Sequence, residues 1–176
     1  MDKIEELQKN YNDIRQYLIE NGQISFLSNV EDYYKKILIL SCASLFENQI
    51  CKTIYDSARS KCPIEFSEFI RNKAIERQYH TYFNWKATNS SGINTFIALW
   101  GDEFKKLFNQ KINADEKLKK GAYDFLILGN ERNLLAHENF IEYNPIKTFD
   151  DVFSLYRNAK YFVDNLLLEI LGFKEN

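Results

Sequence analysis

Apolar residues recur along most of the chain every three or four positions, the spacing of a helix face, rather than at every second position as in strands. Six glycines and two prolines in 176 residues leave few interruptions in that pattern. We therefore predict an all-α fold. The caps and breakers between apolar stretches predict helices over residues 2–20, 30–61, 67–79, 93–100, 102–111, 116–138 and 148–172.

Residues 37–50 are apolar on most faces, which predicts a buried central helix. Their longest apolar run, 37–46, is interrupted by Ser41 and Ser44 and is too short to span a bilayer. The N-terminus is charged and lacks the apolar stretch of a secretory signal, so we expect a cytoplasmic protein with no membrane partner. The length fits one domain over residues 1–176, and no repeat or boundary divides it.

Charge and cysteine content narrow the function classes. A formal net charge of −2 argues against a surface that is basic everywhere, yet it is compatible with a local positive cleft. Three cysteines at positions 42, 51 and 62 lack CxxC spacing, so reduced thiols are expected. Two histidines and scattered cysteines do not make a zinc site, and isolated glycines form no phosphate-cradling loop. We expect no metal and no cofactor.

The strongest candidate for chemistry is the pair Arg132 and His137, five positions apart near the end of a predicted helix. The helix macrodipole would stabilise both side chains at such an end, which is the structural interpretation. The functional interpretation is acid–base chemistry on a phosphodiester. An imidazole ordinarily titrates at about pH 6.5 and can exchange a proton with a ribose hydroxyl, while a guanidinium suits developing charge on phosphorus. One histidine cannot be base and acid in one step, but a two-fold dimer would supply two.

The sequence from Arg132 to His137 resembles the Arg-x4–6-His motif of the HEPN superfamily. Segments 40–47, 77–83 and 125–133 and the final helix are similar to its RiboL-PSP-type group. The match covers residues 29–173, with residues 1–28 as an N-terminal helix and connector. The resemblance implies a helical bundle with additional short helices, dimerisation, and metal-independent RNA cleavage by the 2′-hydroxyl. Its products would be a 2′,3′-cyclic phosphate and a 5′-hydroxyl, and its setting a toxin or phage-defence effector with an antitoxin or regulatory partner.

Carried over residue by residue, the resemblance makes Arg132 and His137 the catalytic pair. It makes Asn133 the polar residue that orients the pair, and Glu47 the acid that holds Arg132 from a facing helix. One branch of the superfamily carries a tyrosine two places after the histidine, where a partner nucleotidyltransferase modifies it. This chain has Asn139 there, and its nearest downstream tyrosine is Tyr143, which argues against that control.

Two other segments are candidate RNA contacts. Lys105, Lys106 and Lys111 belong to a lysine-rich stretch that either guides phosphates or forms a solvated helix face. Residues 79–85 are aromatic and either stack bases or pack in the core, and His80 among them is a candidate substrate contact.

Two other functions stay open. The bundle could be a non-catalytic module that binds nucleic acid, a nucleotide or a protein partner. It could also be purely structural, which a monomer with Arg132 and His137 on unrelated faces would favour.

Overall fold

The computed structural model describes residues 3–138 and 140–172, and within them all regular structure is helical, which confirms the predicted all-α class. The helices are α1 (Lys3–Glu20), α2 (Ile24–Lys61), α3 (Ile64–Ile70), α4 (Tyr79–Tyr82), α5 (Asn94–Ile97), α6 (Asp102–Ala114), α7 (Glu116–His137) and α8 (Phe149–Gly172). A π-helical turn, η1 (Arg71–Ile75), and two 3-10 turns, η2 (Ser90–Ile93) and η3 (Ala98–Trp100), complete the order.

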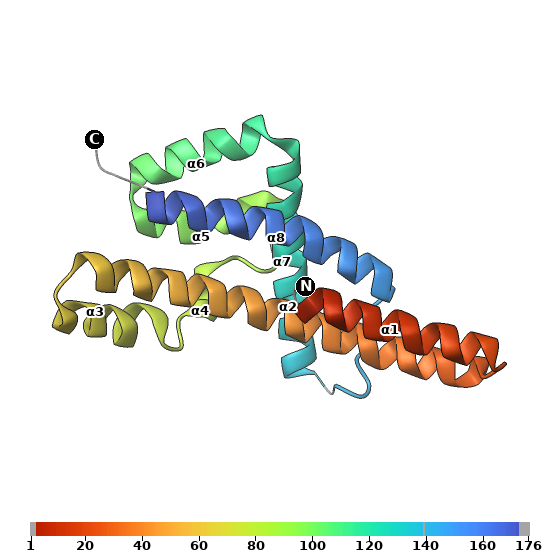
Figure 1. The fold of residues 1–176 in the computed structure, drawn as a ribbon. Helices are drawn as coiled ribbons and strands as arrows, with labels where there is room; N and C mark the ends of the chain where they lie inside the picture. Colours follow the sequence, from red (N-terminus) through yellow and green to blue (C-terminus); the bar gives the residue numbers. More distant parts are fainter. Residues whose placement is uncertain (1–2, 139, 173–176) are drawn as a thin grey trace.

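Helices α2, α7 and α8 build most of the core. Figure 1 shows α1 lying along the first half of α2, while α7 crosses α2 and α8 at a steep angle. Aromatic rings fill the crossing, where Phe46 of α2 stacks on Tyr156 of α8 with ring centroids 5.8 Å apart, and Phe125 of α7 packs against Phe162 at 5.4 Å. The crossing fixes the second half of α7, which carries the candidate motif, against the middle of α2.

The predicted buried helix is confirmed in α2. Its residues Leu38, Ile39, Cys42, Phe46 and Ile50 are all 1% exposed or less. By length and composition alone α2 would also pass as a membrane span, but its apolar face is used to pack against α7 and α8. The helix begins earlier than predicted, because Gly22 already makes the turn after α1 in a left-handed conformation (φ 67°).

The region after α2 departs most from the prediction. The helix predicted over 67–79 is instead α3 followed by the π turn η1, and the chain then leaves helical geometry at Glu76. Arg77 adopts φ 61°, a left-handed conformation that a helix cannot contain. The Tyr82 hydroxyl donates to the carbonyl of Ala74 and so closes this bend by a tertiary contact, which the apolar spacing does not encode.

Helix α7 begins and ends close to the predicted positions. Asp115 is its N-cap, and one carboxylate oxygen accepts from the backbone N–H groups of Lys117 (2.9 Å) and Leu118 (3.0 Å). Along its buried face, Asp124 accepts from Asn158 of α8 at 2.7 Å and so ties the two helices together. The motif residues therefore follow a helix that is fixed at its start and along its length.

A buried lysine holds the chain beyond α7. Lys36 of α2 is 1% exposed, and its ammonium group donates to the carbonyl of Phe140 at 3.1 Å and pairs with Asp32 at 2.9 Å. Tyr143 donates to Glu131 of α7 at 2.9 Å. Asn139, the departure from the tyrosine-modified branch, lies outside the described residues.

Candidate active site

An ion pair joins the motif helix to α2. The guanidinium of Arg132 donates through Nη2 to Glu47 Oε2 at 3.1 Å and through Nη1 to Asn133 Oδ1 at 3.1 Å. The Arg132 and Glu47 side chains are 34% and 37% exposed, so water screens the pair and its contribution to stability is small. Its main effect is to orient the guanidinium. The contacts expected for Asn133 and Glu47 are thus present, while the catalytic roles stay predictions.

Arg132 and His137 border the same cleft. They do so although they are five residues apart, a separation that places them on different sides of α7. The cleft has a volume of about 650 Å³ and opens between the end of α7, the middle of α2 and the irregular segment around α4. It is lined by Glu47, Arg77, Tyr79, His80, Lys86, Arg132, Asn133 and His137. The two residues therefore do not lie on unrelated faces, the arrangement that would have favoured a purely structural bundle.

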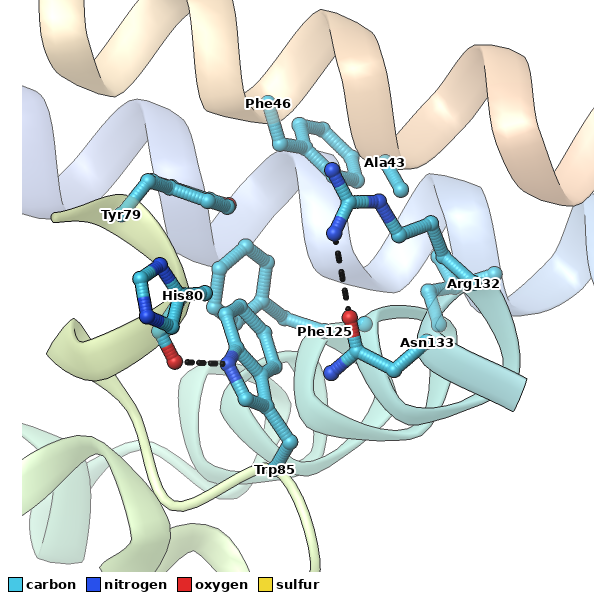
Figure 2. A pocket seen from close by; sticks show the side chains of 10 residues that line it. Ala43, Phe46, Tyr79, His80, Trp85, Phe125, Arg132 and Asn133 are labelled. Atoms are coloured by element: carbon cyan, nitrogen blue, oxygen red, sulfur yellow. Dashed lines mark hydrogen bonds between the residues drawn. The ribbon is translucent and has the colours of Figure 1, made fainter. Parts of the chain in front are cut away.

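Trp85 joins the irregular segment to α7. Figure 2 shows its indole between His80 and the motif helix, with Arg132 and Asn133 beyond it. Its ring lies directly over Gly129, where an added Cβ would be 2.1 Å from the Cε3 atom of Trp85. Its N–H donates to the carbonyl of His80 at 3.0 Å. A glycine at position 129 is what allows His80 and Lys86 to be held this close to α7.

Cations outnumber anions in the cleft. Arg77, Lys86 and Arg132 line it together with a single carboxylate, Glu47, which is already paired with Arg132. In the described part of the chain, no ion pair involves Arg77 or Lys86. Arg77 and Lys86, next to the ion pair of Arg132 with Glu47, make the cleft locally positive, and a positive cleft attracts phosphate groups. A local positive cleft is compatible with the formal net charge of −2.

Tyr79 contributes a neutral polar group. Burial, followed by the charge of Glu47, raises the pKa of Tyr79 well above its usual value. Its phenol therefore stays protonated across the neutral range and cannot serve as a base there.

The aromatic stretch 79–85 divides between the two roles left open for it. Tyr79, Tyr82 and Phe83 are buried and pack in the core, with Phe83 and Phe125 ring centroids 4.9 Å apart. His80 is exposed and lines the cleft, and Trp85 is half-buried at its edge. Core packing thus explains most of the stretch, and the cleft takes the rest.

The structure does not bring the lysine-rich stretch to the cleft. Lys105, Lys106 and Lys111 belong to α6, which joins the start of α7, whereas His137 is at its end (Figure 1). A helix of 22 residues is about 33 Å long at about 1.5 Å per residue. Lys111 also pairs with Glu169 at 2.5 Å. Any RNA contact of these lysines is remote from Arg132 and remains a prediction.

Two features of the site were not identified from the sequence. Gly129 was not recognised as a point of close approach, although an isolated glycine inside a helical stretch is the available signal. Arg77 begins segment 77–83 of the family resemblance, but no sequence signal predicts its left-handed backbone. Within the described residues, no three His, Cys, Asp or Glu side chains gather in a way that could hold a metal ion.

Comparison with known families identifies the family of this chain. A family model described as RiboL-PSP-HEPN matches residues 5–171, which is nearly the whole chain. Comparisons with curated proteins and with solved structures found no significant match.

Proposed function

The chain belongs to the RiboL-PSP-HEPN family, and from that premise we propose that it is an endoribonuclease that cleaves RNA by attack of a 2′-hydroxyl. HEPN domains are commonly ribonucleases or nucleic-acid-related modules, which is the coarse function that membership supports. The observation that carries the finer proposal is the shared cleft, where Arg132 and His137 meet among further cations.

In the proposed reaction His137 exchanges a proton with the reacting oxygens and Arg132 stabilises the charge that develops on the phosphorus oxygens. A guanidinium has five N–H donors, and Glu47 and Asn133 accept from its two terminal nitrogens. The remaining N–H groups of Arg132 can donate to a phosphate. The contacts with Glu47 and Asn133 already restrict rotation of the Arg132 side chain, so phosphate binding would lose less side-chain entropy. Attack of the 2′-oxygen on phosphorus breaks the bond to the 5′-oxygen and leaves a 2′,3′-cyclic phosphate and a 5′-hydroxyl.

The proposal places the protein in the cytoplasm as a toxin or phage-defence effector that acts as a homodimer and is restrained by an antitoxin or regulatory partner. This setting rests on the family analogy alone. The dimer is supported by the need for a second acid–base group, which a second copy of His137 would meet. Its test is the mass of the purified protein in solution.

The activity is tested with purified protein and a labelled single-stranded RNA in the presence of EDTA. Wild type should cut, and Arg132→Ala and His137→Ala should each lose about 100-fold or more in rate while their circular dichroism and thermal unfolding stay unchanged. Lys9→Ala, on the exposed side of α1, is the charge-matched control and should cut like wild type.

Product analysis gives the mechanism. Mass spectrometry should find a cyclic phosphate on the upstream fragment, and a 2′-deoxy nucleotide at the cleaved position should block the reaction. Full activity of His137→Ala would refute the proposed chemistry. Wild type that binds the RNA but never cuts it would instead indicate the non-catalytic module.

A further inference from the structure

A second pocket, called the side pocket below, adjoins the cleft at the end of α7. Its volume is about 420 Å³, which is within the range of pockets that hold small ligands. Three of its lining residues, Lys86, Asn133 and His137, also line the cleft, so the two spaces share a border. A nucleotide whose phosphate lies in the cleft beside His137 can therefore place its base in the side pocket.

The side pocket differs from the cleft in charge. The cleft is lined by three cations and one carboxylate, whereas the side pocket has one group of each sign, Lys86 and Glu138. Apart from the shared histidine, its other polar groups are the neutral amides of Asn84, Asn130 and Asn133. The cleft therefore favours a phosphate, and the side pocket favours a neutral polar group.

The rest of the side pocket is apolar. Phe83, Trp85 and Leu134 line it together with the polar groups, and Trp85 is only half-buried there. Proteins that recognise single-stranded RNA combine aromatic or apolar contacts to the faces of bases with hydrogen bonds to their edges. A nucleobase is a flat neutral ring with a polar edge, so it is the part of an RNA that matches this lining.

The hydrogen-bonding groups of the side pocket have capacity for a ligand. In the described part of the chain, no hydrogen bond or ion pair involves the side chains of Asn84, Asn130 or Glu138. Asn133 accepts from Arg132 through Oδ1, which leaves its Nδ2 group to donate. Glu138 is exposed, and an ionised carboxylate accepts through both oxygens and cannot donate. The side pocket thus offers amide donors and one acceptor that can take two N–H groups.

We infer that the side pocket binds the base next to the scissile phosphate and that Glu138 makes it prefer guanine. Guanine is the one RNA base whose Watson–Crick edge has two neighbouring donors, N1–H and the N2 amino group, and these match the two oxygens of a carboxylate. Its O6 atom can accept from an amide such as that of Asn133. The inference rests on the proposed ribonuclease function, and it leaves the need for a second copy of His137 unchanged.

The first test sequences the fragments that wild type produces in EDTA from RNA with a randomised segment. At one fixed position beside the broken bond, guanine should exceed uracil by about fivefold or more, the lower end for a bidentate base contact because Glu138 is exposed. In Glu138→Gln this preference should fall below about twofold, because the amide has one acceptor atom and repels one of the two donors. Cleavage of RNA with uracil at that position should be unchanged, which shows that the variant is folded. Glu142→Gln removes an exposed carboxylate outside both cavities and should keep the preference of wild type.

The second test measures the side pocket without cleavage. Isothermal titration calorimetry compares guanosine 3′-monophosphate with uridine 3′-monophosphate. Wild type should bind the guanosine nucleotide about fivefold or more tightly than the uridine nucleotide. This difference should disappear in Glu138→Gln and remain in Glu142→Gln.

The two tests separate this inference from the proposed function. Wild type that cuts beside all four bases alike or prefers another base, or a guanine preference that survives in Glu138→Gln, overturns the inference and leaves the ribonuclease intact. Wild type that never cuts RNA, yet binds guanosine 3′-monophosphate through Glu138, refutes the proposed function and leaves the side pocket as a nucleotide site. Wild type that neither cuts RNA nor distinguishes the two nucleotides refutes both.

Discussion

Replacing Gly129 by alanine tests the contact that joins the two halves of the cleft. The added Cβ would lie 2.1 Å from two atoms of the Trp85 ring, whereas ordinary contacts begin at 3.4 Å. The ring must therefore withdraw by the difference, 3.4 − 2.1 = 1.3 Å. It cannot do so freely, because the ring centroids of Phe83 and Phe125 are 4.9 Å and 5.5 Å from its own.

Two opposing effects determine how much Gly129→Ala changes the free energy of unfolding. Alanine in a helix interior is favoured over glycine by about 1 kcal/mol, and overpacking costs about 1–3 kcal/mol. Because the ring is enclosed, the upper end of that cost applies and Gly129→Ala should lose a net of about 2 kcal/mol. For a chain of this size that corresponds to a fall in Tm of about 4–8 °C. The RNA-cleavage rate should fall as well, since the displaced indole carries the backbone of His80.

The assay is urea unfolding followed by far-UV circular dichroism, performed in two backgrounds. In wild type the substitution destabilises. In a Trp85→Ala background the clash is gone, so Gly129→Ala should stabilise by about 1 kcal/mol, a coupling of about 3 kcal/mol between the two positions. Gly172→Ala, at a helical glycine with nothing within 4 Å, is the matched control and should not depend on Trp85. Stabilisation by Gly129→Ala in both backgrounds would refute the packing of Trp85 on α7.

Three further outcomes are expected. Lys36→Met should cost about 1–3 kcal/mol in urea unfolding and speed limited proteolysis of the connection after α7, because it removes the donor to the Phe140 carbonyl and leaves Asp32 paired with Lys35 alone; unchanged proteolysis would contradict this role. Burial, and then the charge of Glu47, raises the pKa of Cys51 to about 11, so iodoacetamide should label it at pH 8, read by peptide mass spectrometry, at about one-hundredth the rate of a thiol with the ordinary pKa of 9.0. Arg77→Gly should raise stability by a net of about 0.5–1 kcal/mol, because relief of the left-handed backbone, about 1–2 kcal/mol, exceeds the extra chain entropy of about 0.5–1 kcal/mol that glycine loses on folding. It should also weaken RNA binding and reduce its salt dependence, and unaltered binding would remove Arg77 from the site.

The long helices could be predicted from the sequence because each buries one continuous apolar face. In α7 the predicted start at residue 116 and the predicted end near residue 138 agree with the structure to within a residue, and in α8 the end at Gly172 agrees as well. The region 64–100 could not be predicted in the same way. Its aromatic residues pack on neighbours from several directions, and the bend at Arg77 is held by tertiary contacts such as the one from Tyr82 to Ala74. There, tertiary contacts override the spacing of apolar residues.

The site residues likewise fall into those that could be predicted from the sequence and those that depend on tertiary contacts. Arg132 and His137 share one helix, so their proximity follows from the sequence, and the contact of Arg132 with Glu47 was expected from the family resemblance. The nearness of His80 depends on how the irregular segment crosses α7, which spacing does not encode. Lys105 was expected near RNA from charge alone, but charge does not say at which end of α7 a residue lies.

Backbone strain and unpaired charge, both of which lower stability, lie on one wall of the cleft and not on the other. Helices α2 and α7 hold Arg132 in ordinary helical backbone with its charge paired. The opposite wall has Arg77 in a conformation that costs a non-glycine residue about 1–2 kcal/mol, and it has the exposed imidazole of His80. Among the described residues, neither Arg77 nor Lys86 of this wall has an ion-pair partner. Strain and unpaired charge on one surface are retained when a ligand uses them. Since the ordered wall already supplies the guanidinium, what the irregular wall adds is further positive charge and the exposed imidazole of His80. Both suit the proposed reaction, in which the cleft would bind a phosphodiester before its leaving oxygen takes up a proton.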